Sequence, residues 1–172
     1  MREKRYRKGR VVFFLPLLFL LALSGCEYRM QSLLPAEGAK IAIPYFLNRT
    51  FREDLDEILT GEVIDRFLLG SSLQIVPQEE AEYLLEGEIR SYLNEVLLSD
   101  SAEEEHRVTV KVFARLFQLP QKKLIWEEEV TGVANYSISS TASLQTEYEA
   151  MREACQEIAR QLLNLTLEGW RS

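Results

Sequence analysis

The chain has 172 residues, of which 47% are hydrophobic, and carries 20 Lys and Arg against 27 Asp and Glu, a net charge of −7 at pH 7. Six of the basic residues and one acidic residue fall within residues 1–25, so the rest of the chain carries 14 against 26, a net charge of −12. This balance disfavours nucleic-acid binding and general adhesion to anionic lipid, because both require clustered cations.

The first 25 residues have the layout of a bacterial secretory signal. A basic stretch precedes an apolar run from Val11 to Leu23, which at 13 residues is too short to span a bilayer core that needs about 20. Leu23-Ser24-Gly25-Cys26 then places two small residues before a cysteine, which is typical of a lipoprotein signal. We therefore expect residues 1–25 to be removed and Cys26 to become the first residue, carrying lipid such as palmitate. The alternative is a chance cysteine behind an ordinary signal or a short anchor helix.

The residues after Cys26 divide into a tether and one domain. In enteric bacteria an Asp directly after this cysteine retains lipoproteins in the inner membrane, so Glu27 favours the outer membrane, with the domain facing the periplasm. Residues 26–38 are expected to form the lipidated tether, with Pro35 and Gly38 as breakers. Residues 39–172 are long enough for a single domain with its own core.

The domain is expected to begin with a strand and a helix. The run 40–46 (KIAIPYF) predicts the strand, in which Pro44 indicates an edge position or a strand end. The segment 50–53 (TFRE) matches a capping box and predicts the start of the helix. Apolar residues at helical spacing follow as far as Phe67, and Gly70 is suited to end the helix.

Four further strands are predicted before the last helix. A short one covers residues 73–76, and a long one covers 83–97, with Leu85, Gly87, Ile89, Ser91 and Leu93 on one side. The alternation of valine with polar and aromatic residues predicts a strand over 108–117, and a further strand covers 123–133. An acidic turn at 99–105 and a tight turn at 119–122 join the last three into an antiparallel meander.

A polar loop and an amphipathic helix close the chain. Residues 134–145 (ANYSISSTASLQ) read as a Ser- and Thr-rich loop. The helix carries an apolar stripe of the kind that forms a core face, made of Tyr148, Met151, Cys155, Ile158, Leu162 and Leu165. The predicted fold class is therefore α+β, in the order β-α-β-β-β-β-α. Two amphipathic helices pack on one face of a mixed, largely antiparallel four- to five-stranded sheet.

The opposite face of this sheet is a candidate contact surface. If the helices cover the valine side of 108–117, the other side presents aromatic and cationic residues, which suit a protein partner or an amphiphile. The candidate partner- or lipid-contact residues are Arg90, Tyr92, Lys111, Phe113, Arg115 and Phe117. We hypothesise that they meet a barrel wall or its cargo; the alternative is a face covered by loops or a mixed surface without a role.

The ordered motifs resemble the LptE family, whose members are lipoprotein partners of the LptD lipopolysaccharide translocon. The resemblance begins at Cys26-Glu27-Tyr28 and continues through residues 41–50 (IAIPYFLNRT) and 81–89 (AEYLLEGEI). It ends in the closing helix with Ala154, Ile158 and Ala159, after Trp126 and Tyr136, and so covers nearly the whole chain.

The resemblance implies a lipid-anchored α+β domain in the outer membrane that sits inside the LptD β-barrel as a plug. It also implies help in folding that barrel and contact with lipopolysaccharide during its transport. Some family members carry a basic residue in the turn between the two central strands. Here the turn 99–105 is SDSAEEE, which would repel phosphate, so no lipopolysaccharide-binding residue is transferred to this chain.

Candidate catalytic and metal-binding residues are few. His106 lies beside three glutamates, and the glutamates at 79–82 and 103–105 could bind a divalent cation, but calcium-loop spacing is missing. With Cys26 lipidated, only Cys155 remains, on an apolar helical face typical of a core residue. We therefore expect no enzyme, cofactor or metal. The alternatives are an envelope lipoprotein that serves a different assembly or transport complex, and a lipid-anchored hydrolase.

Overall fold

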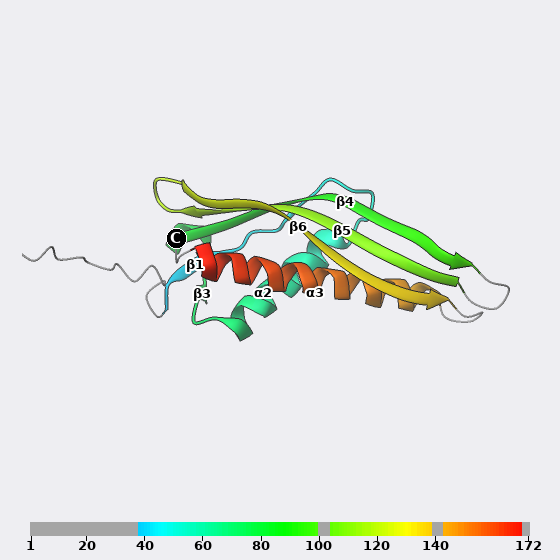
Figure 1. Ribbon diagram of the computed structural model, residues 1–172. Helices are drawn as coiled ribbons and strands as arrows, with labels where there is room; N and C mark the ends of the chain where they lie inside the picture. The colour runs from blue at the N-terminus through cyan, green and yellow to red at the C-terminus, as the bar shows by residue number, and fades with distance from the viewer. Residues whose placement is uncertain (1–37, 100–103, 139–142, 170–172) are drawn as a thin grey trace, which may run out of the picture. The chain divides into compact units, whose positions relative to one another are not determined.

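The computed structural model describes residues 38–99, 104–138 and 143–169, so Cys26, the expected signal and the tether up to residue 37 lie outside the described residues. Figure 1 shows helices α2 and α3 on one side of a single sheet, which confirms the predicted α+β class. The elements in chain order are β1 (Lys40–Ala42), β2 (Leu47–Asn48), α2 (Leu55–Gly70), β3 (Gln74–Ile75), the 3-10 turn η1 (Gln78–Glu80), β4 (Tyr83–Ser99), β5 (Glu104–Gln118), β6 (Lys123–Ile138) and α3 (Ser143–Gly169).

The sheet is mixed, with the strand order β3-β1-β4-β5-β6 and with β2 paired separately to β4. The long strands β4, β5 and β6 are antiparallel, whereas β1 and β2 pair in parallel with β4. Within the described residues the sheet has six strands, rather than the four to five expected, because the run around Pro44 is split. β1 contacts β4 at Leu84 and β2 contacts it at Glu88, and a segment outside both strands links them. Proline has no N–H to donate to a ladder, which favours the interruption.

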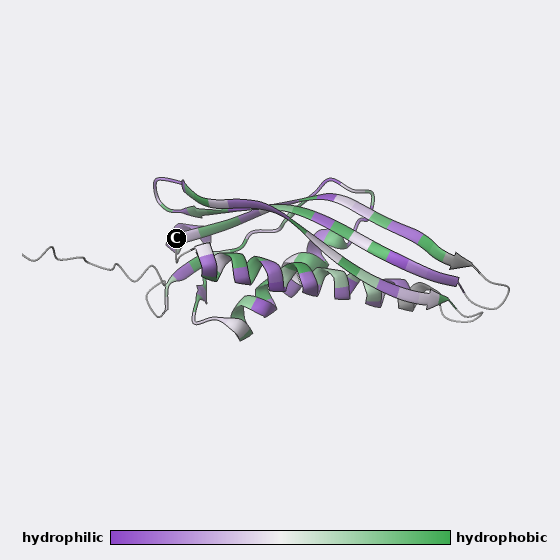
Figure 2. Cartoon of the chain, viewed as in Figure 1, coloured by the Kyte–Doolittle hydropathy of each residue, from purple (hydrophilic) through white to green (hydrophobic). Residues whose placement is uncertain are grey.

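The core lies between the sheet and the helices. The predicted valine side of β5 is fully buried, and residues of alternating hydropathy along the long strands are visible in Figure 2. Burying a large aliphatic side chain stabilises the fold by about 1.5–3 kcal/mol, so this layer is the main source of stability. Its members include Val108, Val110, Val112, Ala114 and Leu116 of β5, Leu55, Leu59, Val63 and Phe67 of α2, and Met151, Cys155, Ile158 and Leu162 of α3. Of the predicted α3 stripe, Leu165 is only partly buried and Tyr148 is exposed.

The predicted capping box at the start of α2 is wrong. The helix begins at Leu55, and its N-cap residue, Asp54, makes no side-chain cap hydrogen bond. Thr50 belongs instead to a loop organised by Asn48, whose Oδ1 accepts hydrogen bonds from the Thr50 N–H (2.9 Å) and hydroxyl (2.8 Å). The short Asn side chain closes a local turn, and this competes with an earlier helix start. The helix ends at Gly70, as predicted.

A bulge in β4 changes which side its later residues face. The register with β5 shifts between Ile89 and Ser91, so that Arg90 is an extra residue in β4. Ile89 lies opposite a core valine, but Ser91 lies opposite Lys111, on the other face. The expected one-sided row therefore breaks at the bulge, and Ser91 and Leu93 face away from the helices.

The last long strand continues beyond its predicted end. β6 reaches Ile138, and Ala134 and Tyr136 are buried, although both were expected in a polar loop. Each lies opposite a β5 residue, so the strand pairing extends along nearly all of β5. Residues 139–142 of the predicted loop lie outside the described residues, and α3 begins at Ser143.

Candidate interaction surface

The side of β4, β5 and β6 that faces away from the helices, which we call the open face, carries a row of aromatic and cationic side chains. The guanidinium carbon of Arg90 lies 4.0 Å from the centroid of the Phe113 ring. The guanidinium of Arg115 lies 5.9 Å from Phe113 and 5.7 Å from Phe117, and Lys122 Nζ lies 5.0 Å from Phe117. Exposed cation–π contacts stabilise by about 0.5–1 kcal/mol each, so the row is held in a defined arrangement.

Carboxylates accompany most of these cations. Glu86 accepts a hydrogen bond from Lys122 (2.9 Å) and lies 3.8 Å from Arg115, while Arg90 contacts Glu129 at 3.4 Å. Lys111 is exposed and forms no ion pair within 4.0 Å with another described residue. The open face therefore combines apolar rings with cations of which Lys111 is the most available to an external anion.

The structure brings together five of the six residues predicted for this surface. Arg90 and Arg115 both contact Phe113, Phe117 adjoins Arg115, and Lys111 follows the same alternation on β5. The contact role of this set stays a prediction.

Tyr92 does not belong to the open face. It lies two residues after the bulge, opposite Val110, and its side chain points to the helix side, where its hydroxyl donates to Glu147 Oε1 of α3 at 2.7 Å. Burial, followed by the hydrogen bond to Glu147, raises the pKa of Tyr92. Its expected position on the contact surface was wrong because the sequence contains no visible mark of the bulge.

A second feature lies at the edge of β4, beside the bulge. Arg49, Arg52 and Arg90 line a cavity of about 430 Å³, together with Phe51 and the two β4 residues that come after Arg90. We call this the arginine pocket. Arg49 and Arg52 were not singled out as functional from the sequence. The signal that could have found them is the run 49–52 (RTFR), two arginines around an aromatic residue in an otherwise acidic chain.

These features lie within the range matched by a family model. The model of the LptE lipopolysaccharide-assembly family matches residues 39–166, which extend from β1 to the last turns of α3. The chain belongs to the LptE family. The family is one of non-enzymatic assembly lipoproteins.

Solved structures with the same fold have little sequence in common with this LptE-family chain. A protein from Xanthomonas campestris aligns with a TM-score of 0.60 at 12% identity, covering 80% of this chain and 89% of that one. A protein from Chlamydia trachomatis aligns with a TM-score of 0.57 at 12% identity, covering 77% and 98%. At this identity the similarity concerns the fold alone. No curated protein matches the sequence.

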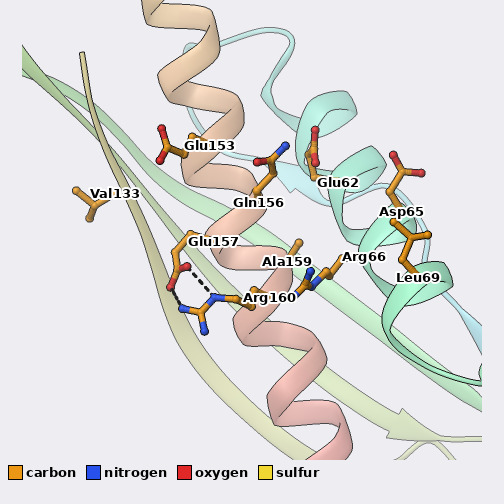
Figure 3. Close-up of a pocket in the computed structure, with 10 residues that line it drawn as sticks. All are labelled: Glu62, Asp65, Arg66, Leu69, Val133, Glu153, Gln156, Glu157, Ala159 and Arg160. Carbon is orange, nitrogen blue, oxygen red and sulfur yellow. Dashed lines mark hydrogen bonds and ion pairs between the residues drawn. The ribbon is translucent and has the colours of Figure 1, made fainter. Parts of the chain in front are cut away.

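A groove also lies between the two helices of the LptE-like domain. It has a volume of about 470 Å³, and Figure 3 shows it between α2 and α3, with Val133 of β6 at its margin. Arg160 donates two hydrogen bonds to Glu157, at 2.6 and 3.0 Å, and these lower the pKa of that carboxyl group. The charges at the rim of this groove are therefore partly neutralised within the chain. The rim side chains do not converge on one point as the ligands of a bound ion would.

His106 and Cys155, which the sequence offered as candidates for catalysis or metal binding, contact other side chains of the fold or are buried in its core. His106 stacks on Tyr136, with ring centroids 5.0 Å apart, and lies 3.3 Å from Glu104. Burial raises the pKa of the Cys155 thiol to about 12, so the reactive thiolate is rare at neutral pH. Over residues 38–99, 104–138 and 143–169, no three His, Cys, Asp or Glu side chains converge as metal ligands, and no helix is long and apolar enough to cross a membrane.

Proposed function

We propose that the chain is a lipid-anchored lipoprotein of the outer membrane that occupies the lumen of an LptD-type β-barrel and helps to assemble it for lipopolysaccharide transport. The observation that carries this proposal is the family match, which spans residues 39–166. On this proposal the domain works by binding and catalyses no reaction.

Two features of the chain support the two parts of this proposal, the lipid anchor and the protein partner. The segment 23–26 (LSGC) supplies the expected lipidation site at Cys26. The open face supplies a fixed set of aromatic rings and arginines, which are residue types enriched at protein interfaces. Lys111 adds a charge that is free to meet an acidic group of the barrel or of its cargo.

Affinity purification tests the partner. The full-length protein is tagged at its C-terminus and isolated from envelopes solubilised in mild detergent. We expect a large β-barrel protein to be recovered in about equal amount and to persist through washing. Recovery of an inner-membrane transporter without a barrel would contradict the proposal and favour a lipoprotein of another complex.

Metabolic labelling tests the anchor separately. Growth with labelled palmitate should label the wild-type protein and the Cys155→Ala variant alike, and should leave Cys26→Ser unlabelled. The two variants each remove one cysteine, so the comparison isolates the site. Label retained in Cys26→Ser would show that the lipidation prediction is wrong.

A further inference from the structure

The outer side of β6, which we call the β6 edge, has no neighbouring strand in the described residues. β6 (Lys123–Ile138) ends the sheet on one side, whereas the two-residue strand β3 ends it on the other. Helix α3 lies against one face of the sheet (Figure 1). A free strand edge presents a row of unpaired N–H and C=O groups, and an extended segment of another chain can pair with them.

The hydrogen bonds of the sheet show which β6 residues turn their backbone groups outward. The Leu119 N–H donates to the Glu82 carbonyl (2.8 Å), so odd-numbered β5 residues bond to β4 and even-numbered ones to β6. From Trp126 onward, even-numbered β5 residues pair with even-numbered β6 residues. Odd-numbered β6 residues therefore direct their N–H and C=O groups to the β6 edge. Gln161 of α3 agrees with this assignment, because its Nε2 donates to the Thr131 carbonyl (3.0 Å).

The two halves of the β6 edge differ in how well they are protected from pairing. The first half contains an extra residue, Ile125, where the register with β5 shifts, and three consecutive glutamates at 127–129. Bulges and charges are common devices that keep an edge strand from pairing. The second half, residues 131–137 (TGVANYS), contains no charge, no proline and no register shift. Its odd-numbered residues after Thr131 are exposed, and they leave about 20 Å of edge open to a partner.

Carboxylates surround this uncharged stretch. Figure 3 shows Val133 next to the side of α3 that carries Glu153 and Glu157, and all three residues line one groove. Glu157 is paired with an arginine of α3, but Glu153 and the glutamates at 127–128 form no ion pair within 4.0 Å with another described residue. Residues 26–172 carry a net charge of −12, so pairing of two copies at this edge is opposed by repulsion. The charges favour a segment with basic residues.

From these observations we propose that residues 131–137 form a docking site for an extended segment of a protein partner, which adds a strand to the sheet and carries basic residues at its C-terminal end. Backbone hydrogen bonds to the outward groups of Val133, Asn135 and Ser137 form the ladder. The added strand runs antiparallel to β6, which continues the antiparallel pattern of the long strands and is the more stable pairing. Its C-terminal end then lies beside the glutamates at 127–129. The proposal goes beyond the function proposed above, since it concerns the β6 edge and not the open face.

Amide hydrogen exchange, measured by NMR on the full-length protein in a nonionic detergent, tests the proposal. The probe is the acetylated peptide TVTVTVTVKVK, which in an antiparallel ladder reaches from Ser137 to Glu127. In the free protein we expect slow exchange for the even-numbered residues in 132–136, whose amides bond to β5, and fast exchange for the odd-numbered residues in 133–137. Peptide at about ten times its Kd should slow the odd-numbered amides roughly tenfold and leave the even-numbered amides unchanged.

Two substitutions at Val133 separate the backbone donor from the side chain. Val133→Pro removes one outward N–H, and an edge strand tolerates proline, so the fold should stay intact while the affinity for the peptide falls roughly tenfold. Val133→Thr keeps the N–H and a β-branched side chain, so it should bind the peptide as the wild type does. Similar unfolding temperatures of the two variants would confirm that the fold is kept.

The charge preference is tested with peptide direction and with the glutamates, and this test does not depend on the proline variant. The reversed peptide KVKVTVTVTVT has the same composition but places its lysines away from residues 127–129, so it should bind roughly threefold more weakly or less still. Glu127→Gln with Glu128→Gln should abolish this difference. The matched control, Glu79→Gln with Glu80→Gln, makes the same charge change at two exposed residues of η1 and should keep it.

Three results would overturn the inference. Slow exchange of the odd-numbered amides in the free protein would mean that another part of the chain, or a second copy, already covers the β6 edge. Peptide that leaves these amides unprotected, or that binds Val133→Pro as well as Val133→Thr, would exclude the edge as the site. Equal affinity for the two peptide directions would exclude the basic segment. Because these measurements use the purified chain and synthetic peptides, they are independent of whether a barrel is recovered in the affinity purification.

Discussion

Gly132 of β6 lies directly against the backbone carbonyl oxygen of Ala154 in α3. A Cβ atom at Gly132 would overlap this oxygen, and a second obstacle is the Ile158 side chain. Because Gly132 has no side chain, α3 can approach the sheet closely at the centre of the core. A larger residue would meet the α3 backbone, which cannot rotate away as a side chain can.

The first prediction concerns this contact. Gly132→Ala should destabilise the domain by about 1–3 kcal/mol, because α3 must shift to admit the new methyl group. Gly61→Ala is the control, since a Cβ there meets no atom within 4 Å. At this exposed position of α2 the change should be neutral or stabilise by up to about 1 kcal/mol. Denaturant unfolding measures both. Similar stability of the two variants would argue against close packing at Gly132.

The second prediction concerns the loop before α2. Asn48→Ala removes the acceptor of two Thr50 hydrogen bonds and the donor to the Arg52 carbonyl, so we expect a loss of about 1–3 kcal/mol. Asn135→Ala, which removes one exposed hydrogen bond from Arg107, should change the free energy of unfolding by no more than about 0.5 kcal/mol. Thermal unfolding of the two variants should separate them clearly. If both behave like the wild type, the loop is not held by Asn48.

The third prediction is a pH dependence. Burial, with a smaller effect of Glu62, raises the pKa of Cys155 from 9.0 to about 12 in the folded state. Between these values the unfolded thiol loses its proton while the folded thiol keeps it, so stability falls as the pH rises above 9. The loss is about 1.4 kcal/mol per pH unit, or about 2 kcal/mol by pH 10.5.

Cys155→Ala isolates this effect. The variant is less stable at pH 8 because it leaves a cavity, but it lacks the thiol, so its stability should fall less steeply between pH 8 and pH 10.5. The measurement is denaturant unfolding of both proteins at the two pH values. Parallel curves would mean that the thiol is accessible or not perturbed.

The parts of the fold that the sequence could predict depend on local periodicity. The valines of β5 and the helical spacing around Ile158 placed two core faces correctly, because burial imposes a period of two on a strand and 3.6 on a helix. The predicted end of α2 at Gly70 was also correct, and it too rests on a local property, since glycine has a low helix propensity.

The errors occur where tertiary pairing decides the structure. The bulge at Arg90 inserts one residue, so the later β4 residues face the opposite side of the sheet. The bulge can be recognised only from the register between β4 and β5. Tyr136 was predicted to lie in a loop because its neighbours in sequence are polar. It is buried, because β6 stays paired with β5 up to the end of β6. The arginine pocket was missed for the same reason, since Arg49 and Arg90 are distant in sequence and meet only through the pairing of β2 with β4.

The last prediction tests the open face as a partner surface. Lys111→Glu and Arg115→Glu should each reduce the amount of barrel protein that co-purifies, roughly tenfold for a charge that meets an opposite charge in the complex. Lys111 is the sharper test, because Arg115 also contacts Glu86 and the rings of Phe113 and Phe117, and its reversal disturbs the face itself.

Arg66→Glu provides the matched control for these reversals. It makes the same charge change at an exposed position of α2, on the opposite side of the sheet, and should leave co-purification intact. Outer-membrane permeability to a large antibiotic gives a second measurement, which should rise for Lys111→Glu and not for Arg66→Glu. If the two variants retain the barrel equally and permeability stays normal in both, the part of the open face around Lys111 is not the contact surface, because reversing a charge that meets an opposite charge weakens a complex.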